Sequence, residues 1–304
     1  MEQQLIDTTY KLIDTTYSIS DTVGIAEKLS KVFIGEGSPI QSIFKWLHII
    51  AGITWIGLLY FFNWINGHFA ATLDADTKKK VVPELLPRAL YWFRWGAAWT
   101  WFTGLVLLYV LYWHQNLAIG EIGGGLMFDS TTEVTYWAHI MILVTFLAVF
   151  LYDYLYKTGL AANVRLITGI SFILIGVVVY CMKFCGGFDY RALNIHLGAM
   201  FGTIMAFNVW FRIWPAQQQI ISAIKNGDTP DGDLVALAGL RSKHNTYMSV
   251  PLLWTMINAH TSYFAGGNDL YLTDHNWIAL MAVVALGWHI VWQLYKKSGT
   301  IKGM

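Results

Sequence analysis

Four histidines lie within long apolar stretches of this sequence, where an imidazole ring is costly unless it has a partner. They are His48, His139, His196 and His260. Such rings on facing helices are typical axial ligands of a haem b, whose macrocycle fills the interior of a helix bundle. The pattern therefore predicts a non-covalent haem b, with at least two of the four histidines bound to the iron.

Other interpretations of these residues stay open. A single buried histidine is usually structural and bonds a neighbouring carbonyl, and four converging rings would also suit copper or zinc. Lys45, one helical turn before His48, is a candidate partner for a haem propionate, although snorkelling toward the membrane surface explains it equally well. Met256 is a candidate ligand or a core residue. Neither cysteine belongs to a C-x-x-C-H motif, which excludes a covalent haem c in this sequence.

Composition and hydropathy place these histidines in an all-α, polytopic membrane helix bundle. Hydrophobic residues make up 56% of the sequence and charged residues 13%, whereas soluble domains carry about 25% charged residues. A net charge of +1 without a basic cluster argues against a nucleic-acid partner. About seven segments are long enough to cross roughly 30 Å of hydrocarbon. They are residues 40–65, 90–113, 134–156, 164–184, 192–214, 247–264 and 277–295.

Three regions follow from these segments. Residues 1–39 repeat LIDTTY and predict an N-terminal amphipathic, interfacial helix. Residues 40–295 form the haem-binding transmembrane bundle, and residues 296–304 form a cytoplasmic tail. The basic loops after the first, third and fifth segments are cytoplasmic by the positive-inside rule. This orientation places the four histidines in the outer half of the bilayer.

The cytoplasmic loops and one acidic residue yield further predictions. Residues 70–88 predict a short amphipathic helix ended by Pro87, and Pro215 predicts a break before another helical stretch. Asp153, within the third segment, is expected either to pair with Lys157 or to serve a proton path.

Four runs of sequence are similar to motifs of a known family. They are WLHIIAGITWIGLLYFFN at 46–63, RALYWFRWGAAWTWFTG at 88–104, GTIMAFNVWFRIWPAQQ at 202–218 and RSKHNTYMSVPLLWTM at 241–256. In this order they resemble the membrane domain of the bacterial urate hydroxylases, the urate oxidase N-terminal domain. Together with the haem b predicted from the histidines, the resemblance implies a membrane oxidoreductase that takes electrons from urate in the bacterial inner (cytoplasmic) membrane. Family members commonly continue into a cytochrome c domain, which this sequence does not show after its last span.

The resemblance therefore implies a separate acceptor, either a cytochrome c or a quinone. We favour a cytochrome docking on the outer loops at 114–133, 185–191 and 265–276, whose acids suit the steering of a basic protein. These acids are Glu121, Asp129, Glu133, Asp269 and Asp274. Positive-inside topology alone explains them equally well.

Two other functions stay open. One is a non-catalytic, haem-bearing electron-transfer or accessory subunit of a respiratory complex. The other is an enzyme similar to the membrane protoporphyrinogen oxidases, whose first helices carry a lysine and a histidine at the spacing of Lys45 and His48.

Overall fold

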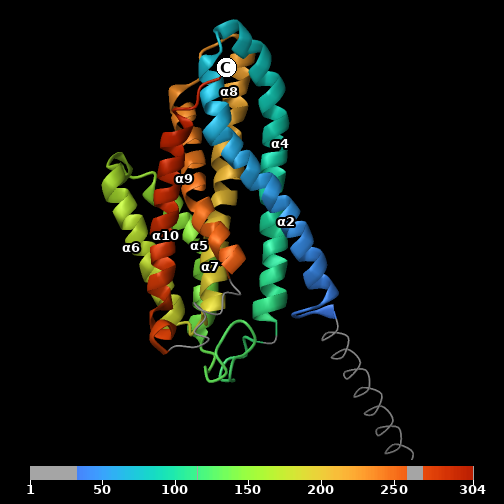
Figure 1. The fold of residues 1–304 in the computed structure, drawn as a ribbon, viewed down its shortest axis with the longest axis vertical. Coiled ribbons are helices and arrows are strands. Elements are labelled where there is room, and N and C mark those ends of the chain that lie inside the picture. Colours follow the sequence, from blue (N-terminus) through green and yellow to red (C-terminus); the bar gives the residue numbers. More distant parts are fainter. Residues whose placement is uncertain (1–32, 115, 259–269, 304) are drawn as a thin grey trace, which may run out of the picture.

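Long helices run side by side between the two ends of the molecule (Figure 1). The structure is a computed structural model that describes residues 33–114, 116–258 and 270–303. Its helices are α2 (Pro39–Tyr60), α3 (Gly67–Thr72), α4 (Ala75–Leu108), α5 (Tyr136–Leu155), α6 (Val164–Phe184), α7 (Tyr190–Asn208), α8 (Trp214–Asn226), α9 (Gly232–Ile257) and α10 (Leu270–Ser298). Apart from one isolated bridge, Ile122 to Glu133, these residues form no β-structure. The predicted all-α class is confirmed, whereas most of the predicted N-terminal helix lies outside the described residues.

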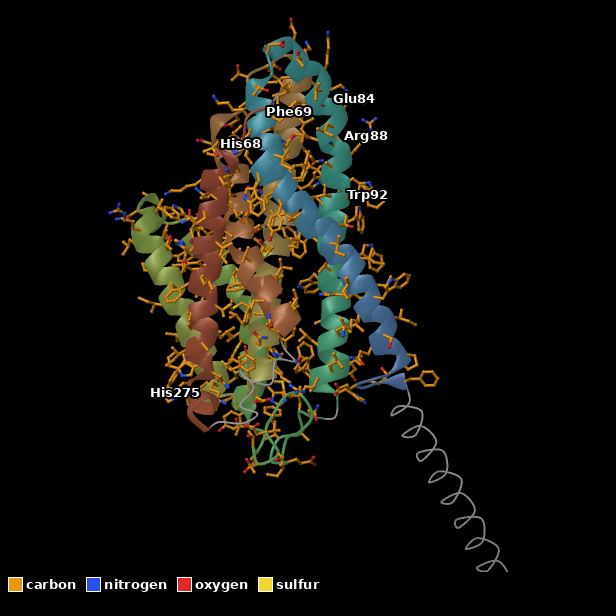
Figure 2. All side chains as sticks on the ribbon, in the orientation of Figure 1. His68, Phe69, Glu84, Arg88, Trp92 and His275 are labelled. Carbon is orange, nitrogen blue, oxygen red and sulfur yellow. The ribbon has the colours of Figure 1, made fainter. Side chains whose placement is uncertain are left out.

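Six helical segments are long and apolar enough to cross a membrane. They are Pro39–Thr72, Ala75–Trp113, Tyr136–Leu155, Val164–Phe184, Tyr190–Asn226 and His275–Ser298. Helix α9 makes a further pass through the bundle, and the span predicted at 247–264 continues beyond it into residues that the structure does not describe. Large apolar side chains cover the sides of the bundle, such as Trp92, which is 61% exposed (Figure 2). The chain is therefore a multi-pass membrane protein.

The connections between helices gather at two ends of different charge. The lysine-rich end contains Lys78, Lys79, Lys80, Lys225, Lys296 and Lys297, and the acidic end contains Glu121, Asp129 and Glu133. Figure 2 shows His68 toward the lysine-rich end and His275 at the acidic end. Successive long helices alternate in direction between these ends, as the predicted order of spans requires.

Three wide π-helical turns interrupt the long helices, at Phe61–Asn66, Tyr109–Trp113 and Val209–Ile213. A π-turn adds a residue to the helical repeat and so rotates the side chains that follow it. Each turn directs one polar group into the bundle. Asn63 donates to Ser242 Oγ at 2.8 Å, Trp113 donates to His196, and Arg212 donates to Asp153.

The two helix breaks predicted at prolines are wrong. Helix α4 begins after Asp74, which accepts from Thr77 N at 2.9 Å, and runs unbroken through Pro87 with α8 packed against it. Pro215 lies in the first turn of α8, directly after a π-turn. A proline is tolerated there because its missing N–H removes no regular helical hydrogen bond.

Helices α2 and α4 cross closely at Gly96. A Cβ at this position would lie 3.2 Å from Trp55 N and 3.3 Å from the Ala51 carbonyl oxygen, which are backbone atoms of α2. Small residues permit such close crossings in membranes. We expect Gly96→Ala to lower the free energy of unfolding by about 1–3 kcal/mol, because the backbones must separate.

Thermal unfolding in detergent measures this effect, with Gly239→Ala as the matched control. Gly239 also lies inside a helix, but a Cβ there would meet no atom within 4 Å. The control is expected to be neutral or slightly stabilising, because alanine favours a helix more than glycine does. Equal melting temperatures for the two variants would contradict a tight crossing at Gly96.

Candidate functional site

A large cavity lies between α2, α4, α7 and α9, and we call it the first cavity. Its volume is about 650 Å³, within the range of roughly 300–1,000 Å³ that is typical of cofactor sites. Most of its lining is apolar, and small residues from three helices form part of it. These small residues are Gly52, Gly57, Gly104, Gly198, Ala199 and Gly202.

Thr103 determines which nitrogen of His48 carries the proton. The Thr103 hydroxyl lies 2.6 Å from the Trp99 carbonyl oxygen, to which it donates its single proton, and 3.1 Å from His48 Nδ1. Nδ1 therefore donates to Thr103 Oγ1, and Nε2 carries the lone pair. Metal-bound histidines have this arrangement, in which the second ring nitrogen donates to the protein. His48, which lines the first cavity, is thus ready to act as a ligand.

Lys45 and Met256 line the same cavity as His48. Lys45 is exposed, so its ammonium can reach a charged group at the edge of the cavity. The Met256 side chain comes from α9 and lies over α7, where a Cβ at Gly198 would be 3.0 Å from its Cε. The first cavity therefore brings together an imidazole, a thioether and a cation. These fit a haem, because a histidine and a methionine are a known ligand pair for its iron and a cation suits its propionates.

His196 is fully buried outside this cavity, and protein groups occupy both of its ring nitrogens. Nδ1 donates to the Ala192 carbonyl oxygen at 2.7 Å, and Nε2 accepts from Trp113 Nε1 at 3.0 Å. The rings of Tyr112 and Phe188 pack around it, with centroids 6.1 and 4.8 Å from that of the imidazole. Iron could bind His196 only if Trp113 moved away.

The other predicted ligands lie apart from the first cavity or outside the described residues. His139, near the start of α5, does not line the cavity, and its buried Nδ1 has no hydrogen-bond partner among the described residues. His260 lies outside the described residues. Within the described part of the chain, no three His, Cys, Asp or Glu side chains gather as a metal site. The structure therefore brings His48 and Lys45 together, but neither His139 nor His196 joins them.

A buried ion cluster centred on Asp153 lies in the half of the bundle nearer the lysine-rich end. The carboxylate accepts from Arg212 Nε at 2.8 Å and from Arg241 Nη2 at 3.0 Å, and Lys157 Nζ lies 2.7 Å from it. Arg241 is only 1% exposed, and its Nε and Nη1 have no partner among the described residues. The predicted pair of Asp153 with Lys157 is confirmed.

Sequence reasoning missed Arg241 as a buried residue, because it precedes the span predicted at 247–264 and its charge is typical of a basic cytoplasmic loop. Arg241, Asn245, Met248 and Leu252 are all buried on one face of α9. This spacing of three to four residues continues the apolar period of the predicted span backward by two turns. Extending that period would have found the residue.

The acidic end carries exposed acids as predicted. Glu121, Asp129 and Glu133 are exposed, whereas the side chains of Asp269 and Asp274 lie outside the described part of the structure. Asp189, just before α7, is half-buried. Burial raises the pKa of its carboxyl, with a smaller contribution from the charge of Asp129.

A known family matches most of the chain. The sequence profile of the urate oxidase N-terminal family matches residues 73–302, which span α4 to α10. Helix α2, with His48 and Lys45, precedes the matched region. No curated protein and no solved structure shows a significant match.

Proposed function

Because the chain belongs to the urate oxidase N-terminal family, we propose that it is a membrane oxidoreductase that takes electrons from urate and passes them through a haem b to a separate acceptor. The bacterial inner membrane is the proposed location, with the lysine-rich end in the cytoplasm. This orientation puts the His48 end of the first cavity in the outer half of the bilayer.

The observation that carries the haem proposal is the hydrogen bonding of His48, which leaves one ring nitrogen free to bind a metal. A neutral ring whose Nδ1 donates to Thr103 leaves the Nε2 lone pair available in a cavity of about 650 Å³. In this proposal His48 would hold the haem iron, and Met256 is a candidate for the second ligand because it lines the same cavity. His139, His196 and His260 remain candidates for the second position. A bound haem b would supply one-electron redox chemistry.

The other lining residues have positioning roles in this proposal. Gly52 and Gly57, where a Cβ would meet no atom closer than 3.9 Å, would leave room for the macrocycle, and Lys45 would pair with a propionate or with the urate anion. For the acceptor, a basic cytochrome c would approach the exposed acids of the acidic end, and a quinone would approach from the lipid.

The apolar lining of the first cavity favours a second candidate function. Urate is polar and offers several hydrogen-bonding groups, but few polar side chains line this space. A non-catalytic, haem-bearing electron-transfer subunit needs no such groups. A protoporphyrinogen oxidase-like enzyme would also suit an apolar cavity that holds Lys45 and His48.

A visible spectrum of the purified protein under anaerobic conditions separates these functions. We expect a haem b spectrum whose reduced bands appear when urate is added. Reduction by a quinol or a reduced cytochrome, but not by urate, would favour the electron-transfer subunit. Consumption of protoporphyrinogen, without reduction of the haem by urate, a quinol or a cytochrome, would favour the protoporphyrinogen oxidase-like enzyme. Protein from haem-supplied cells that lacks a Soret band would overturn the haem proposal.

A further inference from the structure

A second cavity lies on the other side of α7 and α9, and we call it the second cavity. Its volume is about 440 Å³, and α5, α6, α7, α9 and α10 line it. Several apolar side chains of its lining are also part of the exposed side of the bundle: Leu151 is 51% exposed, Val164 70% and Trp292 43%. Figure 1 shows α6 at the side of the bundle. The second cavity therefore opens sideways, where the lipid lies.

Aromatic rings and apolar side chains make up most of the lining. The aromatic residues are Tyr152, Tyr156, Phe201, Tyr247, Trp288 and Trp292. Flat rings of this kind pack well against the faces of another ring. A ligand from the lipid phase that carries an aromatic or quinonoid ring therefore fits this space better than a polar metabolite does.

A chain of hydrogen bonds determines the proton position on His244, which also lines the second cavity. Asn245 Nδ2 donates to the Met205 carbonyl oxygen at 3.0 Å, so Asn245 Oδ1 accepts from Asn208 Nδ2 at 2.9 Å. The same Asn208 nitrogen donates to the Tyr152 hydroxyl at 2.9 Å, and this hydroxyl lies 2.8 Å from His244 Nδ1. Tyr152 therefore donates its proton to Nδ1, and the His244 proton is on Nε2.

His244 Nε2–H has no protein hydrogen-bond partner among the described residues. A polar donor left unpaired in apolar surroundings costs free energy, so the site favours a ligand with a neutral acceptor atom. We propose that the second cavity binds a lipid-soluble quinone, with one carbonyl oxygen accepting from His244 Nε2 and the ring packed among the aromatic side chains.

The role of this quinone, though not its binding, rests on the proposed function. Reduction of the quinone to the quinol takes two electrons, which arrive from urate through the proposed haem, and two protons, which come from water at the lysine-rich end. Helix α9 connects the two sites. His244 of the second cavity and Leu252 of the first are eight residues apart, about 12 Å along a helix.

Binding of decylubiquinone to the full-length protein in detergent tests the proposal without any need for haem or urate. We expect His244→Ala to raise the Kd about tenfold, because a hydrogen bond in an apolar site is lost. Ala148→Trp, which fills the cavity without removing a polar group, is expected to abolish binding. The control is His68→Ala, since His68 bonds Ser298 and lines neither cavity.

A carboxylated lipid is the competing occupant, because Lys243 also lines the second cavity. Binding of decanoate that Lys243→Gln abolishes, without binding of decylubiquinone, would overturn the proposal. Equal decylubiquinone affinity in the wild type, His244→Ala and Ala148→Trp would also overturn it, since the quinone would then bind elsewhere. If the quinone binds as expected but urate does not reduce the haem, the proposed function fails and this site stands.

Discussion

Replacing Asp153 by alanine is expected to lower the free energy of unfolding by about 3–5 kcal/mol. The carboxylate is the only counter-charge that Arg241 contacts among the described residues, and Arg241 is 1% exposed. Without Asp153 the guanidinium stays buried and unpaired, while Arg212 and Lys157 turn toward solvent, because their side chains are already 24% and 57% exposed. Chemical unfolding in mixed micelles, followed by tryptophan fluorescence, measures the loss.

Two further variants isolate the cause of this loss. Glu84→Ala removes the carboxylate of an exposed pair, Glu84 with Arg88 (Figure 2), and is expected to cost less than about 1 kcal/mol. Adding Arg241→Met to Asp153→Ala removes the unpaired buried charge and is expected to restore part of the lost stability. If Asp153→Ala costs no more than Glu84→Ala, or if the double variant is less stable than the single one, the buried charge is not the cause.

The fold could be predicted from the sequence because bilayer thickness and hydropathy constrain it strongly. The segment Val164–Phe184 is apolar between Arg165 and Lys183, near its two ends, so hydropathy predicts a span at 164–184, which is where α6 lies. The alternating direction of successive helices follows from the order of the spans, whereas the side of the membrane on which each end lies stays a prediction from the charges of the loops. Proline misled the prediction at Pro87 and Pro215, because neighbouring helices and a π-turn stabilise these positions and neither is visible in a local pattern.

The π-turns also limited what could be predicted about the site. A regular period of 3.6 residues assigns Trp113 and Arg212 to helix faces that the extra residue of each π-turn then changes. The hydrogen bond from Trp113 to His196 and the ion pair of Arg212 with Asp153 both depend on that rotation. Counting residues placed His196 near the start of its helix, where it lies in α7, but did not predict its partner.

Sequence spacing also could not predict which of the histidines lines the first cavity. Depth in the bilayer comes from position along a helix, whereas sharing a cavity depends on how neighbouring helices pack. His48 lines the first cavity because α2 crosses α4 obliquely at Gly96, and His196 lies behind the wall of that cavity. Thr103, which orients His48, comes from a different helix and carried no signal in the sequence.

Replacing His48 by alanine is expected to remove haem from the purified protein. The variant loses the imidazole whose Nε2 lone pair is available in the first cavity, and a methionine alone binds haem iron weakly. The ratio of Soret to protein absorbance measures occupancy. Free imidazole added during purification is expected to restore the spectrum, because it can occupy the space that the side chain leaves.

Thr103→Val distinguishes ligation by His48 from a general effect on folding. Valine keeps the shape of threonine but cannot accept from Nδ1, so haem affinity is expected to fall by about 10–100-fold while the protein stays folded. Thr203→Val is the control, because Thr203 also lines the first cavity but bonds Trp101 and a backbone carbonyl rather than His48.

Full haem occupancy in His48→Ala, or equal losses of haem in the two threonine variants, would contradict ligation by His48. The ligand would then be another of the predicted histidines. His196→Ala would then test whether His196 is that ligand. Loss of haem from this variant would mean that His196 binds the iron and that its hydrogen bond from Trp113 is broken in the haem-bound protein.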